Sequence, residues 1–389
     1  MITTIPVSPA VLRWARETAG LEIDAVVKGL NRIRITGETI TAWESGTDSP
    51  SYSQLKLLAY QIYKRPLALF FFPKPPEEET PKQSFRTLPE QEIELMPARM
   101  RFLIRKARVM QLNLAELYDN INPALKNIVR SLNFNPQIEA SLMAREVRKY
   151  LEIDLDTQTK WSGGEDALNR WREILETHGI YIFKDAFRIT SFSGFCLYDE
   201  QFPIIYVNNT KSKNRQIFTL FHELAHLLFQ TGGVDKPIED YLRYLDGNNR
   251  LIEILCNRFA GEFLVPTEDF KSRLRDVPID DKSIQGMADY YHVSREVILR
   301  KIYDEGLVDS VFYSEKVKKW EGEASKKSER GGNYYNTQGA YLGERYLDKA
   351  FSKYYQNQIT LEQLADYLGV KVRLVTGMEN LLYRKGPFK

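Results

Sequence analysis

The chain has 389 residues, of which 43% are hydrophobic and 27% are charged. This composition provides enough apolar side chains for buried cores, and it excludes disordered, fibrous and collagen-like chains. The length favours two or three domains. Two cysteines cannot form a disulfide framework, so we expect a reducing, cytoplasmic location. A net charge of +2 neither establishes nor excludes binding to nucleic acid.

Neither a signal peptide nor a membrane span is expected. The first residues lack the basic-then-apolar layout of a secretory signal. The longest apolar run, Leu67–Phe72, is six residues long, whereas a transmembrane helix needs about 20. We therefore expect no membrane partner.

Two changes of composition divide the chain. Residues 73–82 hold four prolines and three consecutive glutamates, a pattern typical of a stiff, solvated linker. Residues 315–332 are rich in Lys, Glu and Ser, and within them Lys316–Arg330 is predicted to be a solvated linker. The resulting segments are 1–75, 76–160 (linker and helices), 161–310 and 311–389 (linker and helices).

Apolar spacing predicts short helices over residues 9–18, 23–30, 38–44 and 52–63. The segments Thr39–Gly46, Gln54–Ala59 and Arg65–Phe72, together with Pro50, resemble the helix-turn-helix module of Xre-type repressors. The resemblance implies an all-α, five-helix DNA-binding domain over residues 1–75 that contacts an operator or promoter. It also implies candidate base contacts and phosphate contacts, namely Thr36, Glu38, Thr39 and Thr41 for bases, and Arg32 and Arg34 for phosphates. The alternative is a five-helix bundle for partner docking or dimerisation, with which a homodimer is compatible.

The middle of the chain changes from helical to strand-like patterns. Apolar spacing of three and four predicts helices across residues 93–151 and 165–177. Short β-branched and aromatic runs then predict strands at 180–183, 194–198 and 203–207, in a sheet that is mostly antiparallel. The strand at 204–207 either holds an extended substrate by edge pairing or is an ordinary strand. A helix beginning near Lys213 follows, and the remaining chain is helical.

The most informative motif lies in that helix, in the sequence Phe-His-Glu-Leu-Ala-His at residues 221–226. His222 and His226 are four residues apart, so both imidazoles lie on one face of a helix and can reach one tetrahedral metal ion. Glu223 projects to the side, where it can contact a metal-bound water. The flanking residues are apolar nearly all round, and two histidines with a carboxylate inside a buried helix favour a bound zinc ion.

A catalytic zinc site usually has three protein ligands, so one ligand has to come from elsewhere. The next apolar helix, residues 251–265, contains Glu253 among apolar neighbours, Glu262 near its end and Cys256 between them. A carboxylate in such a helix requires a cation, which favours Glu253 over Glu262. Cys256 is a rival thiolate ligand, or simply a small buried residue.

Three segments resemble the ImmA/IrrE family of zinc metallo-endopeptidases, namely residues 203–209, 218–226 and 253–266. The resemblance implies a third zinc ligand at Glu253 and a fold that is mainly α with a small, zincin-like α+β core. We infer further that Asn257, one turn later, orients Glu253 or the zinc-bound water. Family members act on repressor-like regulators, which implies a repressor or a toxin–antitoxin component encoded nearby as the protein partner.

The hypothesis from sequence is a zinc-dependent endopeptidase in which Glu223 is the general base. The candidates for stabilising the oxyanion are Tyr198, Tyr206 and His292. The alternative is a non-catalytic transcription regulator or antitoxin whose zinc domain is vestigial or sensory. The helical pairs 283–291 with 294–303, and 360–369 with 370–382, either bind DNA or protein or simply pack onto a core.

Overall fold

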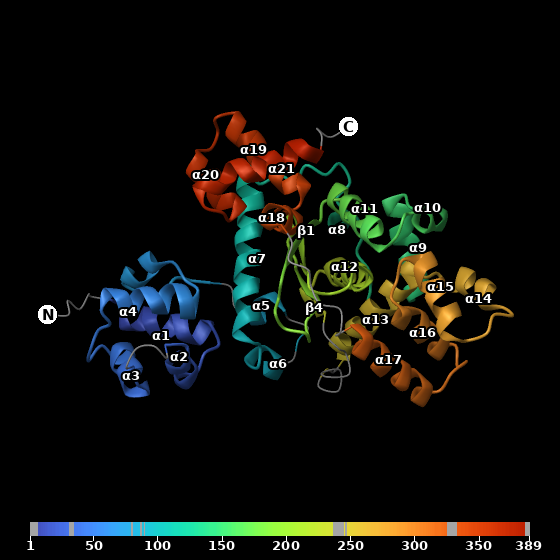
Figure 1. The fold of residues 1–389 in the computed structure, drawn as a ribbon, viewed down its shortest axis with the longest axis horizontal. Coiled ribbons are helices and arrows are strands. Elements are labelled where there is room, and N and C mark those ends of the chain that lie inside the picture. The colour runs from blue at the N-terminus through green and yellow to red at the C-terminus, as the bar shows by residue number, and fades with distance from the viewer. Residues whose placement is uncertain are drawn as a thin grey trace. The chain divides into compact units, whose positions relative to one another are not determined.

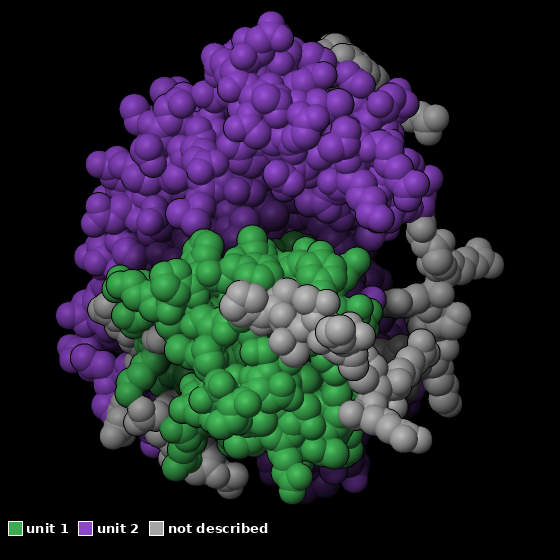
Figure 2. Space-filling view, turned by 90° about the vertical axis from the view of Figure 1, so that its left-hand side faces the viewer, with its two compact units in different colours: residues 1–106 green, residues 107–389 purple. Residues whose placement is uncertain are grey.

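A computed structural model describes residues 7–30, 35–78, 81–85, 88, 90–235, 245, 247–324 and 333–385. The chain divides into two compact units, residues 1–106 and 107–389, which Figure 2 colours separately. The described chain is mainly helical with one small mixed sheet in the second unit, which confirms the predicted fold class (Figure 1). Among the described helices, none combines the length and hydrophobicity needed to cross a bilayer. The predicted division into four segments stays a prediction.

Unit 1 is a small helical bundle, whose elements are α1 Pro9–Thr18, α2 Ile23–Gly29, α3 Gly37–Ser45, α4 Tyr52–Leu57, the π-helical turn η1 Leu58–Tyr63, the 3-10 helix η2 Leu67–Phe71, α5 Pro81–Ser84 and α6 Glu90–Glu94. The predicted helix at 52–63 therefore changes to π-helical geometry after Leu57. The hydroxyl of Thr36 accepts a hydrogen bond from the Thr39 amide and thereby caps α3, which ends at Gly46 in a left-handed conformation with φ 80°.

An ion pair joins two helices inside this bundle. Arg16 of α1 donates to both carboxylate oxygens of Glu44 of α3, at 2.7 and 2.9 Å, and the Glu44 side chain is only 5% exposed. Trp43 beside it is part of the apolar core. The bidentate pair fixes the packing of α3 on α1, because it satisfies a buried carboxylate with two charge-assisted hydrogen bonds.

The helical region predicted over residues 93–151 is broken into several helices. Its helices are α7 Ala98–Leu117, which continues from unit 1 into unit 2, α8 Ile128–Ser131 and α9 Ala140–Leu151. Asp119 and Asn120 adopt left-handed conformations after α7, and Pro123 follows them. These residues end the helix, because the left-handed conformation reverses the chain and proline lacks an amide donor. Two further helices, α10 Leu155–Thr159 and α11 Gly164–Thr177, lead to the sheet.

The sheet contains four strands in the order β1-β3-β2-β4 within the described residues, namely β1 Tyr181–Asp185, β2 Gly194–Leu197, β3 Ile204–Asn208 and β4 Gly233–Asp235. β2 pairs antiparallel with β3 and with β4, as the sequence indicated, whereas β1 and β3 are parallel. The suggestion that residues 204–207 hold a substrate by edge pairing is wrong. β3 lies between β1 and β2, so both of its hydrogen-bonding edges are already used.

The two faces of the sheet are covered by different helices of unit 2 (Figure 1). α12 Lys213–Leu228 packs on the face that presents Cys196, Ile205 and Val207, and it shares an apolar cluster with α9, α11 and α13 Gly247–Leu264. On the opposite face, Phe183 contacts the ring of Tyr346 in α19 Glu344–Tyr355. Gln111 of α7 donates to the main-chain carbonyls of Leu197 and Phe202. The metal motif therefore lies between the sheet and the helical layer.

The remaining elements are α14 Thr267–Leu274, α15 Asp281–Tyr291, α16 Arg295–Asp304, α17 Ser310–Ala324, α18 Tyr334–Leu342, α20 Leu361–Leu368, the 3-10 helix η5 Val372–Leu374 and α21 Val375–Lys385. The solvated linker predicted at Lys316–Arg330 is wrong for its first part, because residues 316–324 belong to α17. Trp320 is buried there against the guanidinium of Arg295. Residues 325–330 lie outside the described chain.

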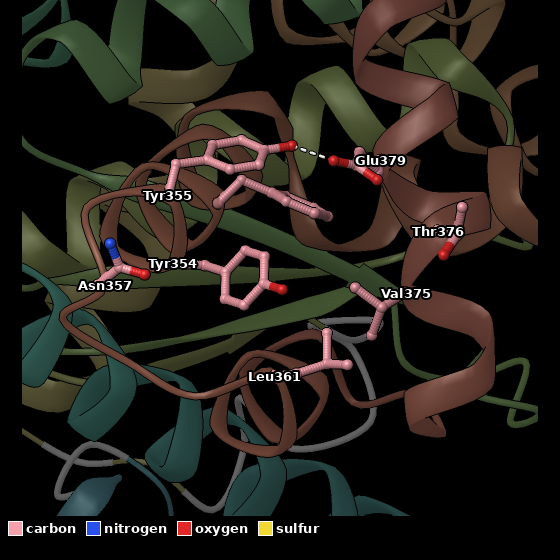
Figure 3. A pocket seen from close by; sticks show the side chains of 8 residues that line it. Tyr354, Tyr355, Asn357, Leu361, Val375, Thr376 and Glu379 are labelled. Atoms are coloured by element: carbon pink, nitrogen blue, oxygen red, sulfur yellow. Dashed lines mark hydrogen bonds between the residues drawn. The ribbon is translucent and has the colours of Figure 1, made fainter.

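The C-terminal helices enclose a pocket of about 510 Å³ between α19, α20 and α21. In Figure 3 the rings of Tyr354 and Tyr355 extend across this pocket, and the Tyr355 hydroxyl donates to the carboxylate of Glu379. The start of α20 is closed by Thr360 and Gln363, which form the capping box that the sequence predicts.

Candidate metal centre

α12 carries two of the three predicted ligands and is buried on every side. Ser212 caps its start by accepting a hydrogen bond from the amide of Arg215, and the helix contains neither glycine nor proline. Every residue from Gln216 to Leu228 is buried. This degree of burial follows from the apolar residues around the motif, and it removes His222, Glu223 and His226 from water.

The structure brings the three predicted ligands together. The Nε2 atoms of His222 and His226 are 3.3 Å apart. Glu253 of α13 places one carboxylate oxygen 3.4 Å from Nε2 of His226 and the other 3.9 Å from Nε2 of His222. One ligand atom from each residue lies within 4.8 Å of the others, and all three side chains are buried.

These separations fit a zinc ion. Two ligand atoms of a tetrahedral zinc, each about 2.0–2.1 Å from the ion, are roughly 3.3 Å apart. The Nε2 atoms of the two histidines are 3.3 Å apart. One Glu253 oxygen lies 3.4 Å from Nε2 of His226 and the other 3.9 Å from Nε2 of His222, so the separations are close to that value. Two imidazoles and one carboxylate are also a donor set that zinc uses in hydrolytic sites. The residues present therefore match the ion that the sequence implies.

The electrostatics of the cluster also favour a cation. Burial lowers the pKa of His222 to about 4, so this imidazole is neutral and has a lone pair to donate. Burial raises the pKa of Glu223 to about 8, because its carboxylate is removed from water. Burial opposes the charged form of His226, but neighbouring Cys256 and Glu253 outweigh it and raise the pKa of His226 well above its ordinary value. Cys256 and Glu253 thus favour a positive charge beside His226, which a metal ion would supply.

Glu223 lies beside the ligands without a strong partner. Apart from the nearby thiol of Cys196, neither of its carboxylate oxygens has a hydrogen-bonding partner among the residues that the structure describes. Its oxygen Oε2 lies 2.8 Å from the point that a Cβ on Gly233 would occupy. A buried, unpartnered carboxylate is costly in a purely structural setting, and it is the feature expected of a group that handles a proton.

Comparison with known families agrees with this geometry. Residues 175–303 match the family model described as the IrrE N-terminal-like domain, Peptidase_M78. This part of the chain is therefore similar to a domain of the metallopeptidase type. The match covers the sheet strands β1–β4, α12, α13 and nearly all of α16, but not the N-terminal unit. No curated protein matches the chain.

Two residues that no sequence pattern singled out lie against His226. The hydroxyl of Thr231 donates to the His226 carbonyl at 3.1 Å and lies 3.4 Å from its Nδ1 atom, so it can hold the ring orientation. At Gly233 of β4, a Cβ would lie 2.2 Å from Cδ2 of the same ring. Neither residue has a sequence signal of its own, because both reach the site only through the fold of the loop after α12.

The other ligand candidates are not part of the three-residue ligand group. Glu262 is bonded to Thr267 and, at 2.7 Å, to Lys301, so its charge is already satisfied. Cys256 is buried next to His226 but is not part of the three-residue ligand group, and burial raises its pKa to about 11. Asn257 donates its side-chain amide to the main-chain carbonyl of Glu253, at 3.0 Å. It therefore supports the backbone at Glu253.

The three oxyanion candidates differ in position. Tyr206 projects from the sheet face opposite α12, where it stacks on Phe195. It is therefore separated from the metal centre by the sheet, and this candidate is wrong. His292 lies at the end of α15 in a left-handed conformation, and burial lowers its pKa. Tyr198 packs against the apolar cluster that contains α12, which leaves it as the candidate on the correct face.

The predicted DNA contacts lie at and near the start of α3. Thr36, Glu38 and Thr41 are exposed, and Thr39 is half-buried. The hydroxyls of Thr36 and Thr39 are 3.1 Å apart within the helix cap. Arg32 and Arg34 lie outside the described residues. The Xre-type assignment and the DNA contacts stay predictions.

Proposed function

We propose that the protein is a zinc-dependent endopeptidase that hydrolyses a peptide bond in a repressor-like or antitoxin-like regulator. The observation that carries the proposal is the convergence of His222, His226 and Glu253 at ligand distances beside the unpartnered carboxylate of Glu223. A site that only needed to be stable would have no use for a second buried carboxylate without a partner.

The residues take separate roles in this proposal. His222, His226 and Glu253 would hold the zinc, whose chemistry is to polarise a carbonyl and to make water a better nucleophile. Glu223 accepts the proton of the attacking water and transfers it to the leaving amine. Burial raises the pKa of Glu223 to about 8, which places this carboxylate in the range suited to accepting and returning a proton near neutral pH.

The sheet supports a site for an extended substrate at β4 in place of β3. β4 is the terminal strand among the described strands, and its Gly233 lies directly against His226 and Glu223. A peptide aligned along β4 would bring its backbone close to the base and the ligands.

We further propose that residues 1–75 direct the peptidase to DNA or to a DNA-bound regulator. The support is the exposed, capped helix α3 with its polar side chains Thr36, Glu38 and Thr41. Binding to the DNA upstream of the gene should weaken steeply as salt concentration rises.

The test of the peptidase is Glu223→Gln in the full chain, co-expressed with the products of neighbouring genes. Wild type should remove a full-length regulator, whereas the variant should retain zinc and leave the regulator intact. Normal cleavage by Glu223→Gln would refute the assigned base. Zinc binding without cleavage by wild type would favour a non-catalytic regulator.

A further inference from the structure

Asp235, the last residue of β4, is a buried carboxylate shared between two residues of α12. Its side chain is 2% exposed. The Thr219 hydroxyl donates to Oδ2 at 2.6 Å, and Nη2 of Arg215 donates to Oδ1 at 2.5 Å. Two short hydrogen bonds, one of them charge-assisted, therefore tie the edge strand to the helix.

The residues that hold Asp235 belong to the same face of α12 as the metal motif. Arg215 and Thr219 are four residues apart, and Thr219 precedes His222 by three residues and Glu223 by four. Positions three and four apart lie on one face of a helix. The face of α12 that carries the proposed ligands and base is thus also the face that contacts β4.

We call the contacts of Asp235 with Arg215 and Thr219 the clamp, and this clamp also involves the residue before β2. The amide of Ser193, just before β2, donates to the main-chain carbonyl of Asp235 at 2.8 Å. Nε of Arg215 donates to the Ser193 hydroxyl at 3.1 Å. Asp235 is therefore held by its backbone to one strand and by its side chain to the helix, which leaves the position of β4 little freedom.

That position matters because Gly233 is only two residues before Asp235. A Cβ on Gly233 would come within 2.2 Å of the His226 ring and 2.8 Å of the Glu223 carboxylate. Main chain packed this closely limits how both side chains can turn. A small shift of β4 would release the ring or collide with it.

We propose that Asp235 is a positioning residue that holds β4 against α12 and so fixes the orientation of His226 and Glu223. This inference rests on the proposed function of the site, since it assigns Asp235 a task in the same metal centre. It predicts that loosening the clamp weakens metal binding beyond what a general loss of stability would cause.

The test compares Asp235→Asn and Thr219→Val with two controls in the full-length protein. Glu262→Gln breaks a partly buried ion pair to Lys301, at 2.7 Å, that lies outside the ligand group. Thr219→Ser keeps the hydroxyl that donates to Asp235. The readouts are the visible absorption spectrum of the Co²⁺-loaded protein and zinc affinity in competition with a chromophoric chelator, so no substrate is needed.

We expect Asp235→Asn and Thr219→Val to change the Co²⁺ spectrum and to weaken zinc binding about tenfold or more. Thr219→Ser and Glu262→Gln should keep the wild-type spectrum and affinity, even though Glu262→Gln lowers the melting temperature. Wild-type spectra and affinities in both Asp235→Asn and Thr219→Val would overturn the role of Asp235 while leaving the proposed peptidase intact. A wild-type chain that takes up neither metal would overturn both.

Discussion

The metal cluster of unit 2 and the Arg16–Glu44 pair of unit 1 both bury charged side chains between two helices, but they differ in completeness. Glu44 receives both hydrogen bonds it needs from Arg16. Glu223 receives none from a strong donor within the described chain, and His222 and His226 point their Nε2 atoms at the carboxylate of Glu253. In unit 1 the protein itself satisfies the buried charge. In the metal cluster of unit 2, the buried groups need a partner that the described chain does not supply.

This difference separates structural from functional polar groups. A buried charge that finds its partner in the same chain stabilises one packing of two helices and needs no ligand. Buried side chains at the spacing of metal ligands carry the free-energy cost of burying unpaired polar groups until a cation binds. Changes in the metal cluster should therefore act through metal binding, and changes at the ion pair should act through folding alone.

The largest effect should follow removal of the metal. His226→Ala should abolish zinc binding and lower the melting temperature of the full chain, because metal binding contributes to folding. At free zinc about 100-fold above its Kd, the lost stabilisation is about 2.7 kcal/mol. Calorimetry with and without chelator measures it. Chelator should lower the wild-type transition and leave that of His226→Ala unchanged, and equal melting of wild type in both conditions would contradict the prediction.

Gly233→Ala should disturb the same metal site from the side of β4. The new methyl group would lie 2.2 Å from the His226 ring, so the ring or the strand has to move. We expect a loss of about 1–3 kcal/mol in the free energy of unfolding and weaker zinc binding. Gly261→Ala on α13 is the matched control, since its Cβ would meet no atom within 4 Å. Equal zinc affinity in the two variants would show that the close approach at Gly233 is unimportant.

Breaking the ion pair of unit 1 should lower the free energy of unfolding without changing zinc affinity. Glu44→Gln removes the carboxylate that accepts two hydrogen bonds from the half-buried Arg16, which should cost about 1–3 kcal/mol in denaturant unfolding. Zinc affinity should stay at the wild-type value. Glu17→Gln is the control, because its contact with Arg16 is 3.6 Å long and its side chain is 58% exposed. A Glu44→Gln protein with reduced zinc affinity would break the proposed separation between the two regions.

Lys184 of β1 provides a pH-dependent case within unit 2. Burial, with Arg172 and Lys213 nearby, lowers its pKa from 10.5 to about 7. Between these two values the folded protein binds fewer protons than the unfolded chain, so this group makes stability rise with pH. Lys184→Met should therefore stabilise the protein by roughly 1–3 kcal/mol at pH 6.5 and by much less near pH 10. Denaturant midpoints at both pH values, beside exposed Lys318→Met, test this, and a gain independent of pH would contradict it.

The smallest effect concerns the cap of α3. Thr36→Ala removes the hydroxyl that accepts from the Thr39 amide and should cost about 1 kcal/mol in the unfolding of unit 1. Thr36→Asp should keep the cap and the stability. If Thr36 faces DNA, the added carboxylate should nevertheless weaken binding to the upstream DNA, as measured by a gel-shift titration. Unchanged DNA binding by Thr36→Asp would place the DNA contact elsewhere.

Much of the local structure could be predicted from periodicity and capping alone. α1 was predicted at its observed bounds, α3 and α11 within one residue at each end, and the box at Thr360 as observed. The largest errors of prediction arose where long-range contacts determine the local structure. Trp320 packs against Arg295 and draws a Lys-rich segment into α17, although its composition is typical of a linker. The strand order, which places β3 between β1 and β2, has no local sequence signal either. Strand pairing depends on residues that are distant in the sequence.

The candidate ligands of the metal centre could be predicted from local sequence patterns. A four-residue spacing places His222 and His226 on one helix face whatever surrounds them, since that is a property of the helix. The resemblance in the following helix singled out Glu253. The groups that contact these ligands depend on how the chain folds. Thr231, Gly233 and Asp235 reach α12 because the chain turns back and adds β4 to the sheet, and the contacts that such a turn creates are not encoded in any local repeat.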